Sequence, residues 1–122
     1  MLGHVSIGVQ DLVRAARFYD AALLELGYVR LWTGADGLGY GEPNGPEKLN
    51  IFRRDDASAP GGGCHLAFTA PDRASVAAFH RAALASGGSD NGAPGLRPQY
   101  ASTYFAAFVI DPDGYKLEAV HQ

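Results

Sequence analysis

Apolar and polar residues alternate along two short stretches of the chain, and each stretch follows a histidine. After His4, the residues "VSIGV" turn Val5, Ile7 and Val9 to one face, and after His65 the residues "LAFTA" repeat the pattern. Period-two alternation is typical of a half-buried β-strand. Each strand is followed by apolar residues at helical spacing, introduced by an aspartate and closed by a glycine. The pattern therefore predicts a strand followed by a helix, twice.

The two stretches are copies of each other. The segment "HVSIGVQDLVRAARFYDAALLELG" from His4 aligns without a gap on "HLAFTAPDRASVAAFHRAALASGG" from His65, at a constant offset of 61 residues. In this alignment the expected helix N-caps, Asp11 and Asp72, are equivalent positions. A repeat of this length indicates one supersecondary unit used twice.

Hairpin turns follow the first helix. The Asp-Gly and Asn-Gly pairs in "ADGL" and "PNGP" separate "YVRLWTG", "LGYGE" and "EKLNIFRR" into three antiparallel strands. In the second half "DPDG" joins "TYFAAFVI" to "YKLEAVHQ", whereas the strand expected after the second helix is weak, because it falls in the Gly- and Pro-rich "GGSDNGAPGLRP". Each unit is therefore predicted to be βαβββ.

These elements predict an α+β fold in which two tandem βαβββ modules form a curved mixed sheet around a trough, with the helices on the outer face. We expect one domain: module 1 at about 1–54, a linker at 55–63 and module 2 at about 64–122. The length of 122 residues and the 47% hydrophobic content suit a single core of this size.

Composition narrows the classes of partner. A formal net charge of −3 does not indicate a basic surface for binding nucleic acid, and no apolar run is long enough to span a bilayer. The single cysteine, Cys64, excludes an intramolecular disulfide and agrees with a cytoplasmic location. Because Cys64 is one residue out of phase with His65, we expect its side chain to point into the core.

The last predicted strands of the two modules also match. "KLN" at 48–50 corresponds to "KLE" at 116–118, so Asn50 is the counterpart of Glu118. If the leucines of these segments face the helices, both polar residues face the other way. The side chains of His4, Asn50, His65 and Glu118 are then all predicted to line the trough.

Two imidazoles and one carboxylate on separate strands match a facial triad for a divalent metal ion, which leaves coordination positions open for a substrate. We therefore predict that His4, His65 and Glu118 bind the metal, with Glu118 also the catalytic residue. Zinc, nickel, manganese and iron all accept these ligands. Taken singly, each of the three is more often a surface or core group than a ligand.

Other residues are candidates for substrate binding beside Asn50. Trp32 and Phe52 can form an apolar wall for a planar ligand or serve only in sheet packing. Arg97 and Tyr104 lie in the irregular segment "GLRPQYASTY". The Arg97 guanidinium can anchor an anion or remain a solvated loop group. We expect His80, on the second helix, to face solvent.

The duplicated βαβββ unit, the histidines that begin the two first strands and the closing "DPDGYKLEAV" resemble the vicinal oxygen chelate superfamily over essentially the whole chain. That superfamily contains glyoxalase I, extradiol dioxygenases, fosfomycin-resistance enzymes and bleomycin-binding proteins. The resemblance implies a metal that chelates vicinal oxygens of a substrate and stabilises developing negative charge. Asn50 stands where glyoxalase I usually has Glu or Gln, and because an amide is no general base, this argues against a glutathione-dependent glyoxalase I.

Two classes of function remain open. One is a metal-dependent enzyme, a lyase, isomerase or ring-cleaving dioxygenase, acting on a small oxygenated molecule. The other is a protein of the bleomycin-resistance type that sequesters a drug or metabolite without catalysis. A homodimer is expected in either case, because open sheet edges favour a partner. The sequence leaves open whether the modules pair within one chain or swap between chains.

Overall fold

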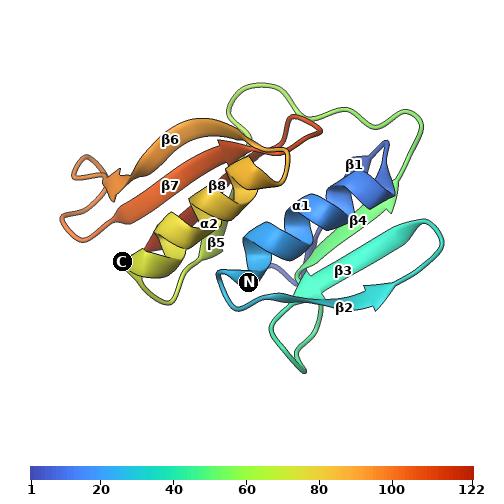
Figure 1. Cartoon of the computed structure of the whole chain (residues 1–122), viewed down its shortest axis with the longest axis horizontal. Coiled ribbons are helices and arrows are strands. Elements are labelled where there is room, and N and C mark those ends of the chain that lie inside the picture. Colours follow the sequence, from blue (N-terminus) through green and yellow to red (C-terminus); the bar gives the residue numbers. More distant parts are fainter.

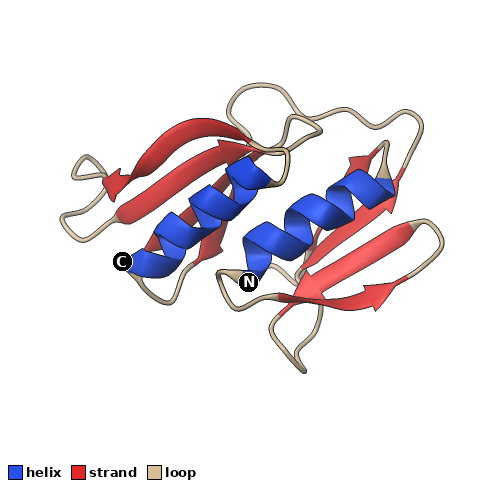
Figure 2. Ribbon diagram, viewed as in Figure 1, coloured by secondary structure: helices blue, strands red, loops and turns tan.

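The computed structural model describes residues 1–122 and contains two helices and eight strands (Figures 1 and 2). In chain order the elements are β1 (Val5–Val9), α1 (Leu12–Leu24), β2 (Val29–Thr33), β3 (Gly37–Gly41), β4 (Leu49–Arg53), β5 (Leu66–Thr69), α2 (Arg73–Ala85), β6 (Ser89–Leu96), β7 (Phe105–Ile110) and β8 (Lys116–His121). The order is βαβββ repeated, as the sequence predicts.

The two sheets have the same topology. Their strand orders are β1-β4-β3-β2 and β5-β8-β7-β6, with the first strand of each module parallel to the last and the other pairs antiparallel. Each sheet is therefore a mixed sheet whose first strand lies at one edge. No strand pair joins the two sheets, so the chain contains two separate four-stranded sheets.

Both helices begin at the aspartates that the sequence predicts. Asp11 accepts a hydrogen bond from the backbone N–H of Arg14 at 3.0 Å, and Asp72 accepts one from the N–H of Ser75 at 2.7 Å. These bonds satisfy amides that the first turn of a helix leaves without partners. Beyond the other end of α1, Gly27 has a φ of +87°, a conformation that residues with a Cβ rarely adopt.

The core lies between each sheet and its helix and continues from one module to the other where the helices meet. Figure 1 shows α1 and α2 side by side in the middle of the molecule, and the two helices are in contact. Phe18 and Phe79, equivalent residues of the two helices, are both completely buried. Neither helix has the length and apolar character needed to cross a membrane.

The turn at 111–114 ties module 2 to module 1. The Tyr115 hydroxyl donates to the carbonyl oxygen of Gly8 at 2.7 Å and accepts from the Gly8 N–H at 3.2 Å. The Tyr19 hydroxyl donates to the buried Asp111 carboxylate at 2.5 Å. These contacts between sequence-distant residues fix the end of β1 against the β7–β8 hairpin.

The strand that the sequence predicts weakly in the Gly- and Pro-rich segment is β6, which lies at the edge of its sheet and pairs with β7 through register irregularities that accommodate its glycines. Two local expectations need correction. Cys64 is exposed, because β5 begins only at Leu66 and the alternation does not extend back to it. His80 does not face solvent: its side chain is 12% exposed and its Nε2 lies 2.9 Å from Asp90 Oδ1.

Candidate functional site

Glu118 is the centre of a polar cluster on module 2. Its neighbours Leu117 and Ala119 lie in the core on the helix side of β8, so its side chain lies on the opposite face of the sheet. The residue is only 2% exposed. His65 Nε2 lies 3.1 Å from Glu118 Oε2, and the Tyr104 hydroxyl donates a short hydrogen bond to Oε1. Both carboxylate oxygens therefore have partners, as a buried charge requires.

Tyr104 enters the cluster from the segment that precedes β7, and its ring packs edge-on against Tyr100 with centroids 5.1 Å apart. Burial, followed by the hydrogen bond to Glu118, raises the pKa of Tyr104 to about 12. The phenol therefore remains protonated near neutral pH. It acts as a hydrogen-bond donor that restrains one oxygen of Glu118.

Phe108 and Arg97 continue the cluster along the same face. Phe108 is paired with Glu118 in the β7–β8 ladder, and its ring centroid is 6.5 Å from that of His65. The Arg97 guanidinium lies over the Phe108 ring, 5.3 Å from its centroid, and donates to the carbonyl oxygens of Ala93 and Gly95. Arg97 is thus held against an aromatic ring at the side of the cluster.

The equivalent face of module 1 carries an aromatic surface in place of a charged cluster. Trp32 extends from β2 across β3, and its indole N–H donates to Asn50 Oδ1 at 3.2 Å. A Cβ on Gly39 would lie 1.9 Å from the indole nitrogen, so glycine is required for the ring to lie on β3. Phe52 is next to it, with ring centroids 6.1 Å apart.

His4 lies just before β1, on the other module from His65 and Glu118, and is exposed. The chain contains no group of three or more His, Cys, Asp or Glu side chains arranged to hold a metal ion. Of the three predicted ligands, the structure thus brings together His65 and Glu118 and leaves His4 apart.

Sequence reasoning missed two features of the cluster. Tyr104 was predicted as a substrate-binding residue, and its direct bond to Glu118 could not be read from an irregular segment. Phe108 was not among the predicted site residues, although the alternation along β7 places its side chain on the same face of the sheet as Glu118 on β8. Parity within a hairpin identifies such cross-strand neighbours.

The fold and the cluster together define a class: paired βαβββ proteins with a histidine and a glutamate adjoining on the sheet face away from the helices. Among solved structures, a glyoxalase/bleomycin resistance protein from Albidiferax ferrireducens T118 is 33% identical, with a TM-score of 0.87, and the match covers 100% of this chain and 98% of that chain. A family model described as the Glyoxalase/Bleomycin resistance protein/Dioxygenase superfamily matches residues 1–119. The chain belongs to this superfamily.

More distant structures share the fold. A glyoxalase-related enzyme from Fulvimarina pelagi is 19% identical with a TM-score of 0.76, covering 100% of this chain and 88% of that one. The bleomycin resistance determinant encoded on transposon Tn5 is 18% identical with a TM-score of 0.66, covering 100% and 98%. No curated protein matches the sequence.

Proposed function

We propose that this protein is a metal-dependent enzyme that acts on a small oxygenated substrate, with His65 and Glu118 as two of the metal ligands. The observation that carries the proposal is the pairing of an imidazole nitrogen with a buried carboxylate at 3.1 Å, on the sheet face that the helices do not cover. A buried ionisable group with a specific partner beside it on such a face is a candidate for a functional site.

The donor chemistry fits a divalent ion. Imidazole nitrogen and carboxylate oxygen bind zinc, nickel, manganese and iron alike. A bound ion with open coordination positions supplies Lewis-acid polarisation to the substrate's oxygens. Tyr104 would act as a positioning residue, because its hydroxyl holds one oxygen of Glu118 and leaves the other directed at His65.

The third ligand in this proposal is His4 of a second copy of the chain. His4 and His65 hold equivalent places in the two modules, and each precedes a strand at the edge of its sheet. Within one chain these residues do not form a three-donor group. A homodimer in which module 1 of one copy faces module 2 of the other would bring them together and would cover two open edges.

The chain's other residues would bind and orient the substrate. Trp32 and Phe52 offer an apolar wall, and Arg97 offers a cation held at the side of the cluster. Glu118 is the carboxylate of the cluster and would move the proton, because the amide of Asn50 cannot. This assignment supports a lyase, isomerase or ring-cleaving reaction and argues against a glutathione-dependent glyoxalase I. We propose a cytoplasmic location on the basis of cysteine usage.

A second candidate function is sequestration of a drug or metabolite. The Trp32–Phe52 surface favours it, because an aromatic floor binds planar ligands without any metal. The fold is also that of a bleomycin resistance determinant. In this case His65 and Glu118 would form only an internal hydrogen bond.

Metal analysis separates the two candidates. Protein purified without chelator should contain about one divalent ion per chain, and His65→Ala should lose it. His80→Ala is the matched control, because His80 bonds an aspartate on the same module but lies outside the cluster. Absence of metal after incubation with zinc, nickel, manganese and iron salts, together with tight binding of a planar ligand, would establish sequestration.

The contribution of a second copy is tested by mixing variants. His4→Ala and His65→Ala homodimers should both lack metal, but a 1:1 mixture refolded together should recover roughly one quarter of the wild-type content, since half the dimers are mixed and each contains one intact site. If the ligands come from one chain, mixing restores nothing.

A further inference from the structure

A cavity of about 300 Å³ lies between the two modules and is separate from the Glu118 cluster. Module 1 contributes residues from α1, from the segment after it, from β3 and β4 and from the loop that joins them, and module 2 contributes residues of β5. Leu23, Tyr40 and Leu49 line the cavity and belong to the hydrophobic core, and Phe68 packs against that core. Since the core lies between each sheet and its helix, the cavity is on the helix side of the sheets, opposite the face that carries Glu118.

Tyr28 links the two modules within the lining of this cavity. Its hydroxyl donates to the Thr69 carbonyl oxygen at 2.9 Å, and its ring centroid is 6.5 Å from that of Phe68. Burial, followed by the charge of Glu42, raises the pKa of Tyr28. The phenol therefore keeps its proton near neutral pH and maintains the bond between the modules.

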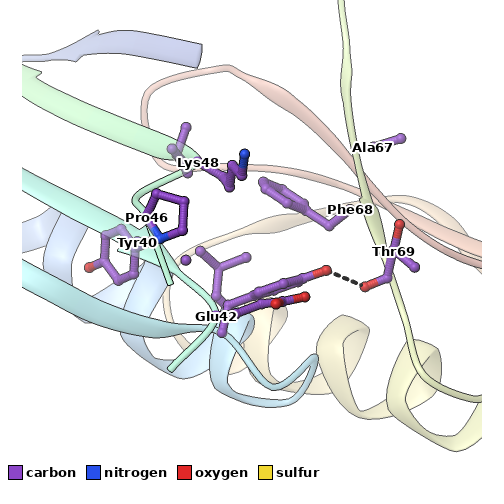
Figure 3. Close-up of a pocket in the computed structure, with 11 residues that line it drawn as sticks. Tyr40, Glu42, Pro46, Lys48, Ala67, Phe68 and Thr69 are labelled. Carbon is purple, nitrogen blue, oxygen red and sulfur yellow. Dashed lines mark hydrogen bonds between the residues drawn. The ribbon is translucent and has the colours of Figure 1, made fainter. Parts of the chain in front are cut away.

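Two opposite charges lie in the lining, and neither is paired with a charged side chain. Figure 3 shows Glu42 and Lys48 of module 1 extending toward Phe68 and Thr69 of module 2. Glu42 and Lys48 are both exposed, and neither belongs to any of the chain's ion pairs. Lys48 Nζ donates to a backbone group, the Gly3 carbonyl oxygen, at 3.2 Å. The mouth of the cavity therefore offers one cation and one anion that no side chain neutralises.

These two charges discriminate between kinds of ligand. A small cation would be attracted by Glu42 and repelled by Lys48, and for a small anion the two effects are reversed. A zwitterion satisfies both charges, and an apolar group beside them can replace water against Leu23, Leu49 and Phe68. We propose that the inter-module cavity binds a free amino acid with an apolar side chain, whose carboxylate pairs with Lys48 and whose ammonium group pairs with Glu42.

The size of the cavity and its aromatic lining support this ligand. The volume is at the lower end of the range of roughly 300–1,000 Å³ for small-molecule sites, which suits one amino acid better than a larger metabolite. Tyr28 lines the cavity together with Glu42, so an ammonium group at Glu42 can also contact an aromatic ring. Because the cavity and Glu118 are on opposite sides of the sheets, the amino acid would bind whether or not a metal ion is present.

Matched probes test the need for both charges. L-leucine carries both, isocaproate is the same molecule without its amino group, and isoamylamine is the same molecule without its carboxylate. In titrations followed by backbone amide NMR shifts, L-leucine should have a dissociation constant at least about tenfold lower than either analogue, with shifts at Lys48, Phe68 and Thr69 but not at Glu118. No shift at the first three amides up to about 10 mM L-leucine, or equal binding of a singly charged analogue, overturns the proposal.

Substitutions at the two charged residues test their assigned roles. Glu42→Gln and Lys48→Met remove one charge each and keep most of the side-chain shape, so each should raise the dissociation constant for L-leucine about tenfold. Glu47→Gln and Lys116→Met are the matched controls, because neither residue lines the cavity, and each should leave the constant within about twofold. Equal effects of Glu42→Gln and Glu47→Gln would overturn the proposal.

Variants of the metal cluster distinguish this cavity from the proposed catalytic site. His65→Ala and chelator-treated wild-type protein should both bind L-leucine with an unchanged dissociation constant, because His65 Nε2 contacts Glu118 on the opposite face of the sheet. Loss of L-leucine binding in His65→Ala would place the ligand in the metal cluster and would show that the cavity proposal is wrong.

Discussion

The two modules have the same topology but carry different chemistry on the face away from the helices. Both have an aspartate N-cap, a buried phenylalanine on the helix and a parallel pair between first and last strands. Module 2 places a histidine, a glutamate and a tyrosine in contact, whereas module 1 places a tryptophan on an asparagine. The helix-facing residues maintain the duplicated fold, and the opposite face is free to differ.

The aromatic residue on this face lies on the outer strand in module 1 and on the strand next to it in module 2. In module 1, Trp32 on the outer strand lies beside Gly39, which is paired with Asn50. In module 2 the outer strand has Gly92, and it lies beside Phe108, which is paired with Glu118. In each case one ring occupies the space that a glycine on the adjacent strand leaves open. The position of the ring decides which polar groups reach the residue on the last strand.

The largest expected effect tests whether the two helices contribute equally to the core. Phe18→Ala and Phe79→Ala should each lower the free energy of unfolding by about 3–5 kcal/mol, because both rings are completely buried. Urea denaturation at neutral pH measures both. Val13→Ala, at an exposed helix position, should change it by less than about 0.5 kcal/mol. A loss below about 1 kcal/mol for either phenylalanine would show that its module is not an equal part of one core.

Substitutions at equivalent positions of the last strands, β4 and β8, test the chemical difference between the two modules. In the metal-dependent proposal, Glu118→Gln should weaken metal binding by about a hundredfold, or about 2.7 kcal/mol, because it removes a charged ligand and keeps the side-chain shape. Asn50→Ala should change the affinity by less than about threefold, since Asn50 is bonded to Trp32. Titration calorimetry compares them. Similar losses for the two would mean that module 1 also supplies a ligand.

The packing of Trp32 on β3 is tested at Gly39. Gly39→Ala should destabilise the protein by about 1–3 kcal/mol, because the added Cβ would lie 1.9 Å from the indole nitrogen and the ring must move. Trp32 is the only tryptophan, so the shift in emission reports directly on its displacement. Gly62→Ala, which has open space around it, is the control. An unchanged emission spectrum would contradict the close contact.

The smallest effects are expected at the helix caps. Asp11→Ala and Asp72→Ala should each lower Tm by about 3 °C at neutral pH. The Ser75 backbone N–H lowers the pKa of Asp72. A lowered carboxyl pKa stabilises the fold above its ordinary value, and that contribution is lost as pH falls through the lowered pKa. The Tm difference between wild type and Asp72→Ala should therefore shrink below about pH 4. A difference that stays constant down to pH 2 would contradict the cap.

Residue patterns predicted the repeat, both caps and the direction in which Glu118 points, because these depend on local periodicity and on backbone amides one turn away. They predicted β6 only weakly, since a Gly-rich segment becomes a strand only when β7 offers a partner. The bond from Tyr104 to Glu118 joins residues on different segments, and no local signal encodes their approach. The prediction that the Cys64 side chain points into the core was wrong, because side chains alternate between the two faces only within a strand.

By itself the sequence determined the two βαβββ units, their strand parity and the superfamily, because each follows from short-range spacing that a backbone must satisfy. Only the tertiary structure decided how the units meet. The helices pack together, the turn at 111–114 bonds to the end of β1, and the two sheets remain separate. That arrangement depends on the summed burial of surfaces from distant segments, which periodicity does not reveal, and it leaves His4 apart from His65 and Glu118 within one chain.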